Sequence, residues 1–122
     1  MADGRQVIVV DDDASVRRSL ARLLRAAGFD VATYASAEAF LENPPDVANI
    51  CLVLDIHLGG MSGLELADCL DRQARAIPIV FISAQEAALY AERRAHVRTI
   101  AFLRKPFDET ALIEAVSRAL PS

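Results

Sequence analysis

Short apolar runs alternate with amphipathic helical segments along this chain, and the alternation restricts its fold more than any other feature. Apolar strands that are interleaved with helices are typical of βα units, in which a parallel sheet is covered on both faces. The sequence therefore predicts an α/β fold with a doubly wound, five-stranded parallel sheet, (βα)5. The predicted strands are residues 7–10, 31–35, 50–54, 79–82 and 100–103.

The spacing of apolar residues places the helices between these strands. In the first helix, apolar side chains recur at helical spacing while arginines take the other face, and Gly28 follows as a stop. Asp13 or Ser15 is a suitable N-cap for this helix, as Asp108 or Thr110 is for the last one. The stretch before the fifth strand gives a weaker helical pattern because its apolar positions are mostly alanine. The predicted helices are residues 16–27, 36–41, 64–74, 85–95 and 109–120.

Length and composition indicate one domain. The 122 residues, 53% of them hydrophobic, suffice for a single compact unit, residues 1–122 with a core from about 6 to 120. The net charge of −4 argues against nucleic-acid binding by this segment, because phosphate contacts need a surplus of Lys and Arg. No apolar run approaches the ~20 residues that span a bilayer, so we expect a cytoplasmic protein without membrane contact. Cys51 and Cys69 have neither the spacing of a zinc site nor that of a disulfide framework.

Polar side chains stand where four of the predicted strands end. Asp11 and Asp12 follow the first strand, Asp55 the third, Ser83 the fourth and Lys105 the fifth. Sheets of this type place their sites at the carboxyl ends of the strands, so these side chains are expected to meet. Three carboxylates can hold a hard divalent cation, while a hydroxyl and an ammonium can bind the oxygens of a phosphoryl group. The pattern therefore predicts a phosphorylatable aspartate site.

At these residues the chain resembles the receiver domain of two-component response regulators, the CheY-like family, and regulators of the FixJ type in particular. The resemblance extends from about residue 7 to 120 and implies a flavodoxin-like fold with strand order 2-1-3-4-5, an order for which a chemotaxis receiver is a standard example. The matching segments are Val10-Asp11-Asp12, Leu54-Asp55-Ile56-His57-Leu58, Met61-Ser62-Gly63, Phe81-Ile82-Ser83-Ala84 and Phe102-Leu103-Arg104-Lys105-Pro106-Phe107.

The resemblance implies a role for each acidic residue. Asp55 corresponds to the phosphoacceptor, and Asp11 and Asp12 correspond to the pair that binds Mg²⁺ together with Asp55. The backbone carbonyl of His57 corresponds to a further metal ligand. The implied reaction is the Mg²⁺-dependent transfer of a phosphoryl group to Asp55, followed by slow hydrolysis, so the domain is a self-catalysing phosphoprotein and not an enzyme in the usual sense.

The same resemblance assigns the response to phosphorylation. Ser83 and Lys105 are expected to contact the phosphoryl oxygens, and the Lys105–Pro106 peptide bond corresponds to a cis bond of the family. Ser83 and Phe102 are the expected switch residues. Their movement would reshape the face formed by the helix of residues 85–95, the fifth strand and the last helix.

The expected partners follow from this signalling role. The phosphoryl donor would be a sensor histidine kinase or a phosphotransfer protein. The reshaped face would control an output and is a candidate homodimer interface. In FixJ-type regulators the output is a DNA-binding domain that follows the receiver, so nucleic acid would be bound there and not by this domain.

Two other functions fit parts of the sequence. The segment Asp11-Asp12-Asp13-Ala14-Ser15 after an apolar strand also fits the opening of haloacid-dehalogenase-type phosphatases, with Asp11 as nucleophile and Asp13 as general acid. That function leaves Asp55 without a role, and the chain is short for such a catalytic domain. The other alternative is a receiver-like module that dimerises without any phosphoryl transfer.

Overall fold

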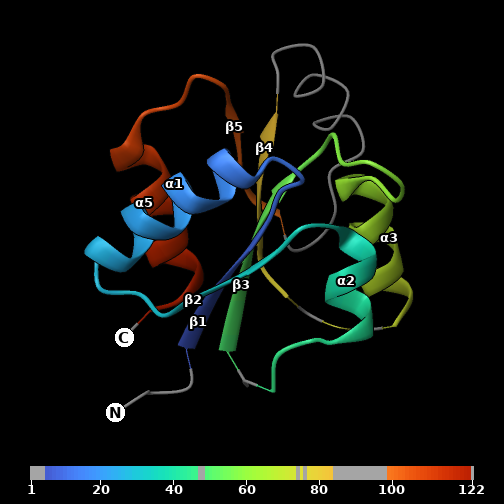
Figure 1. Cartoon of the computed structure of the whole chain (residues 1–122). Helices are drawn as coiled ribbons and strands as arrows, with labels where there is room; N and C mark the ends of the chain where they lie inside the picture. Colours follow the sequence, from blue (N-terminus) through green and yellow to red (C-terminus); the bar gives the residue numbers. More distant parts are fainter. Residues whose placement is uncertain (1–4, 47–48, 74, 76, 84–98, 122) are drawn as a thin grey trace.

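One parallel sheet forms the centre of the computed structural model, which describes residues 5–46, 49–73, 75, 77–83 and 99–121. Its five strands run in the order β2-β1-β3-β4-β5, as the resemblance implied (Figure 1). The predicted flavodoxin-like α/β class is therefore confirmed. The strands are β1 (Arg5–Val10), β2 (Val31–Tyr34), β3 (Asn49–Asp55), β4 (Ile79–Ser83) and β5 (Thr99–Arg104).

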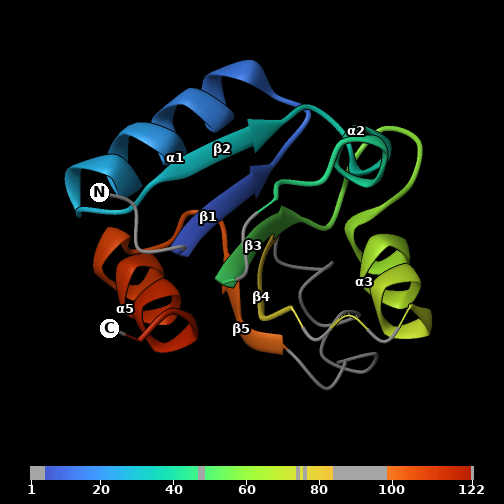
Figure 2. The ribbon, with the colours of Figure 1, turned by 90° about the horizontal axis from the view of Figure 1, so that it is seen from below.

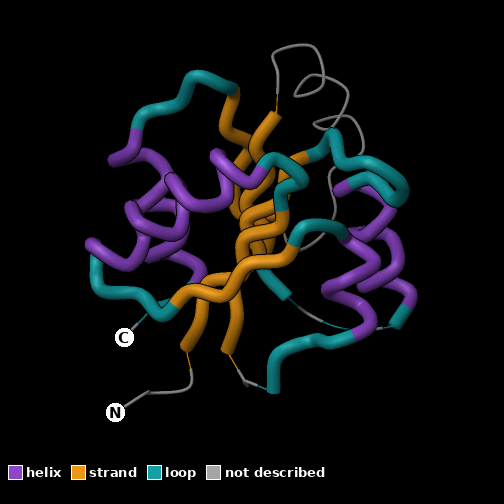
Figure 3. The backbone as a smooth tube through the Cα atoms, in the orientation of Figure 1, coloured by secondary structure: helices purple, strands orange, loops and turns teal. Residues whose placement is uncertain are grey.

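Helices cover the sheet on both faces, with α1 and α5 on one side and α2 and α3 on the other (Figures 1 and 3). Their bounds agree with the predicted segments to within about two residues, which is the usual uncertainty of helix ends. The helix predicted over residues 85–95 lies outside the described residues. The described helices are α1 (Ala14–Ala26), α2 (Ala37–Glu42), α3 (Gly63–Arg72) and α5 (Glu109–Ala119).

Alternate residues of the central strands build two separate hydrophobic cores. In β1, Ile8 faces the core shared with α2 and α3, whereas Val9 faces the core shared with α1 and α5. In β3, Leu54 faces the core shared with α2 and α3, and Val53 faces the core shared with α1 and α5. All four side chains are fully buried, and each contributes roughly 1.5–3 kcal/mol by leaving water. Two buried faces explain why these strands read as continuous apolar runs.

Polar side chains fix where the helices begin. Asp13, and not Ser15, is the N-cap of α1, since its carboxylate accepts the backbone N–H groups of Ser15 and Val16. Asp108, and not Thr110, caps α5 by the same kind of bond. An aspartate in the extended conformation before a helix satisfies N–H groups that have no partner inside the helix.

The remaining sequence expectations concern the thiols and the membrane. Both cysteines are free; Cys51 is buried inside β3 and Cys69 is half-buried on α3. Among the helices that the structure describes, none combines the length and the apolar character needed to cross a bilayer.

Candidate functional site

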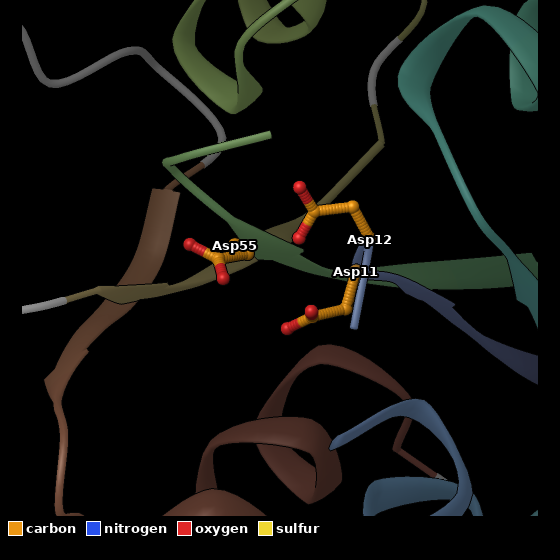
Figure 4. A group of neighbouring side chains, drawn as sticks. All are labelled: Asp11, Asp12 and Asp55. Carbon is orange, nitrogen blue, oxygen red and sulfur yellow. The ribbon is translucent and has the colours of Figure 1, made fainter. Parts of the chain in front are cut away.

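Asp11, Asp12 and Asp55 meet at the carboxyl edge of the sheet, and we call these three residues the carboxylate cluster. Val10 of β1 is paired with Leu54 of β3, so the residues that follow Val10 and Leu54 in the chain lie at the same edge of the sheet. Figure 4 shows the three side chains converging from the ends of these two strands. One oxygen from each carboxylate lies within 4.8 Å of the others.

Asp11 is the most deeply buried member of the cluster, with no exposed surface. Its Oδ1 atom accepts the Asp13 N–H at 2.9 Å, whereas its buried Oδ2 atom has no hydrogen-bond partner among the described residues. The pKa of Asp11 is raised to about 6, mainly by burial and also by the nearby charge of Asp55, against the opposing effects of the Asp13 N–H and Lys105. A buried, unsatisfied carboxylate oxygen in a cluster of three carboxylates suits a hard cation such as Mg²⁺.

Asp55 is held through both of its carboxylate oxygens. Lys105 Nζ lies 3.0 Å from Oδ2, and the backbone N–H of His57 donates to Oδ1 at 2.9 Å. The side chain of Asp55 is 9% exposed and that of Lys105 is 37% exposed, so the ion pair spans the boundary between core and solvent. A carboxylate fixed in this way presents its oxygens in a defined direction.

The backbone positions Lys105 beside Asp55. Its N–H donates to the carbonyl of Ser83 at 2.9 Å, which extends the pairing of β4 and β5 by one residue. The Lys105–Pro106 peptide bond is cis.

Two carboxylates hold the loop that follows Asp55. Asp12 Oδ2 accepts the Gly59 N–H at 3.2 Å. Glu38 of α2 accepts the Met61 N–H at 2.9 Å, and this bond lowers the pKa of Glu38. The loop is therefore tied both to the carboxylate cluster and to α2.

Gly63 allows α3 to begin directly against the end of β3. A Cβ atom at this position would lie 2.5 Å from the carbonyl oxygen of Asp55, which is closer than real Cβ contacts. The Gly63 N–H donates to the carbonyl of Ile56 at 3.0 Å. Any other residue at position 63 would push α3 away from the strand that carries Asp55.

The expected switch residues lie on the neighbouring strands. Ser83 ends β4, is 1% exposed, and is one residue beyond Ile82, the register partner of Asp55. Phe102 of β5 is half-buried and stacks on Phe81, with ring centroids 5.2 Å apart and planes 9° apart. The third part of the expected output face, residues 85–95, lies outside the described residues.

The sequence located the strand-end residues but missed two of their neighbours. Glu38 was not singled out, because nothing in the sequence indicates that α2 reaches the loop after Asp55. Arg17 was placed only on the outer face of its helix, yet its Nη1 atom donates to the Asp11 carbonyl at 2.8 Å. Asp13 is engaged as a helix cap, and the His57 side chain is exposed.

Sequence and structure comparisons converge on one family. Residues 7–117 match the response regulator receiver domain family. The chain is 41% identical over 113 residues to the transcriptional regulatory protein FixJ of Rhizobium meliloti, covering 93% of this chain and 55% of FixJ. It is 39% identical over 114 residues to the transcriptional regulatory protein TdiR of Thauera aromatica, covering 93% and 50% of the two chains. This chain thus spans about half the length of the curated relatives it matches.

Solved structures give the same result. The crystal structure of FixJ-N has a TM-score of 0.84 and 40% identity, covering 98% of this chain and 94% of that one. The structure of the response regulator StyR has a TM-score of 0.81 and 44% identity, covering 95% of this chain and 59% of StyR.

Proposed function

This chain belongs to the family of response regulator receiver domains of two-component systems, and we propose that Asp55 is its phosphoacceptor in a Mg²⁺-dependent reaction. Receiver domains are signalling domains and not conventional enzymes. The observation that carries the proposal is the position of Asp55, which is buried beside two further carboxylates with its Oδ2 atom 3.0 Å from Lys105 Nζ.

The carboxylate cluster fits Mg²⁺. Asp11, Asp12 and Asp55 each offer an oxygen, and the buried Oδ2 atom of Asp11 lacks a hydrogen-bond partner among the described residues. The backbone carbonyl of His57 would complete the protein ligands. When bound, Mg²⁺ would supply positive charge that relieves the repulsion among the carboxylates and neutralises the phosphoryl oxygens.

The protein itself contributes mainly position and charge to the transfer. A carboxylate oxygen of Asp55 attacks the phosphorus of the donor, an Asp–O–P bond forms, and the P–N bond to the donor histidine breaks. Because Asp55 reacts as a carboxylate, no base has to remove a proton from it. Lys105 stabilises the charge of the phosphoryl oxygens, and the Ser83 hydroxyl donates to one of them.

Phosphorylation then changes the packing of the neighbouring strands. Ser83 moves towards the new phosphoryl oxygens, which opens space next to the half-buried ring of Phe102. Phe102 has no hydroxyl, so it responds by packing alone. The result is a shift in population between two packings of the face that includes β5 and α5, and the charge of the phosphoryl group drives this shift.

The relatives support a proposal for the partners and the location of the protein. We propose a sensor histidine kinase or a phosphotransfer protein as phosphoryl donor, in the cytoplasm, and homodimerisation through the face that includes β5 and α5. Since the chain spans about half of relatives called transcriptional regulatory proteins, the proposed output is a DNA-binding domain elsewhere in the full-length protein.

Intact-mass measurement and peptide mapping after incubation with Mg²⁺ and acetyl phosphate test the proposal. One phosphoryl group on Asp55 is expected, and it should be absent without Mg²⁺ and in an Asp55→Asn variant. Label on Asp11 would instead favour the phosphatase alternative. That alternative needs Asp13 as a general acid, yet Asp13 Oδ1 accepts two N–H groups at the start of α1. No label at all would leave a phosphate-independent dimerisation module.

A further inference from the structure

A hollow lined by arginines lies between α1 and the edge strand β2. Its volume is about 450 Å³. Figure 2 shows α1 and β2 side by side, and β2 is the terminal strand of the sheet. We call this feature the arginine hollow; its polar lining consists of Arg17, Arg18, Arg22, Arg25 and Thr33.

The charge of the arginine hollow is not compensated by its own helix. The α1 sequence contains four arginines and no Asp or Glu, although the whole chain carries a net charge of −4. Within the described part of the chain, none of the four guanidinium groups forms an ion pair with a carboxylate. The hollow is therefore a positively charged patch on an acidic protein, where it attracts anions.

Two of the arginines are oriented by the backbone. Arg17 Nη1 donates to the Asp11 carbonyl at 2.8 Å, and Arg25 Nη2 donates to the Val31 carbonyl at 3.1 Å. Each of these bonds uses one of the five N–H donors of a guanidinium group, so further donors are left for a ligand. Arg18 and Arg22 are exposed and make no hydrogen bond among the described residues. Ala21 also lines the hollow.

We propose that the arginine hollow binds a small ligand that carries several linked phosphate groups, such as a nucleoside triphosphate or an inorganic oligophosphate. Guanidinium groups bind phosphate oxygens in bidentate pairs and stay charged at every physiological pH. Arg25 lies eight positions after Arg17 on α1, which is about 12 Å along the helix axis, so a single phosphate group cannot reach both ends. A volume of about 450 Å³ lies in the range of small-molecule sites.

Titration calorimetry with sodium tripolyphosphate tests this site on the whole chain. The buffer contains EDTA, which removes Mg²⁺ that could otherwise bind phosphate at the carboxylate cluster. The ionic strength is kept constant. Saturable binding of one tripolyphosphate per chain is expected, at least tenfold tighter than binding of monophosphate. An Arg18→Ala/Arg22→Ala double variant should bind at least tenfold more weakly.

A matched control removes the same charge elsewhere. Arg72→Ala/Arg118→Ala deletes two arginines from the ends of α3 and α5 and should keep the wild-type affinity. An Asp55→Asn variant should also keep it, which separates this site from phosphorylation. Thermal unfolding of each variant checks that the fold is intact.

Three results would overturn the proposal. One is the absence of saturable binding, or more than one equivalent bound, which indicates general attraction of anions. Another is an equal loss of affinity in both double variants. The third is tighter binding of an oligoglutamate peptide than of tripolyphosphate, which assigns the surface to an acidic protein partner.

Discussion

The carboxylate cluster lies at the buried ends of β1 and β3, whereas the arginine hollow lies between α1 and the edge strand β2. Asp11 is fully buried and burial shifts its pKa to about 6, while Arg18 and Arg22 remain in water. The free energy of a buried charge depends strongly on each neighbouring group, whereas that of a solvated charge depends on its neighbours weakly. Single substitutions in the carboxylate cluster should therefore have large effects on phosphorylation or stability. Substitutions in the arginine hollow should change ligand binding alone.

Lys105 should give the largest effect, because it contacts the buried carboxylate directly. In Lys105→Met, Asp55 loses the ammonium group 3.0 Å from Oδ2, and the phosphorylation rate with acetyl phosphate should fall by about 10²-fold or more. Mass spectrometry at fixed times measures this rate. The neighbouring Arg104→Met serves as control because Arg104 is exposed. Equal losses in both variants would mean that general positive charge matters and not the contact with Asp55.

Asp11→Asn should stabilise the metal-free protein at neutral pH. The folded pKa of Asp11 is about 6, above its ordinary value of 3.8, so folded wild type binds the proton more tightly than the unfolded chain does. Wild-type stability therefore falls as the pH rises from about 4 to 6, by on the order of 2 kcal/mol from this group. An asparagine is neutral throughout and avoids this loss.

Urea unfolding in EDTA at pH 4 and pH 8 measures the difference. The variant should exceed wild type at pH 8 and match it near pH 4. Added Mg²⁺ should stabilise wild type more than the variant, because the variant has lost one carboxylate ligand. A variant that is less stable than wild type at pH 8 in EDTA would show that the Asp11 carboxylate is well satisfied without metal.

Glu38 tests whether an exposed charge can act through the backbone. Its carboxylate is exposed but accepts the Met61 N–H, and this bond holds the loop after Asp55. Glu38→Ala should change the lifetime of the phosphoryl group on Asp55 by only about two- to fivefold, since exposed hydrogen bonds contribute little net energy. Glu38→Gln keeps an acceptor oxygen and should restore most of the wild-type lifetime. Glu42→Ala is the control, and the same change in this variant would exclude a specific role for Glu38.

The fold was predictable because its strands are buried on both faces. Five apolar runs marked the strands, and the polar residues that end them located the carboxylate cluster at one edge. The strand order came from the resemblance to receivers, since apolar runs alone carry no information on which strands are neighbours. The pairing of Val10 with Leu54 explains why the strand-end residues meet.

Contacts between distant segments were beyond the sequence pattern. The bond from Met61 to Glu38 joins residues 23 positions apart, and neither belongs to an apolar repeat. The choice between Asp13 and Ser15 as helix cap required the backbone conformation, which is extended at Asp13. The arginine hollow exists because α1 lies beside β2, whereas the sequence indicated only an outer helical face.

Removing two arginines from the hollow should have the smallest effect on stability. Arg18→Ala/Arg22→Ala should change the free energy of unfolding by less than about 0.5 kcal/mol, as is usual for surface positions without specific contacts. Alanine favours helices at least as well as arginine does, so α1 keeps its propensity. Urea unfolding at low salt measures the change, because screening is weakest there. A loss above about 1 kcal/mol would mean that these guanidinium groups stabilise the fold through packing or charge. The exposure of the hollow to solvent would then not make it less sensitive to substitution than the buried carboxylate cluster.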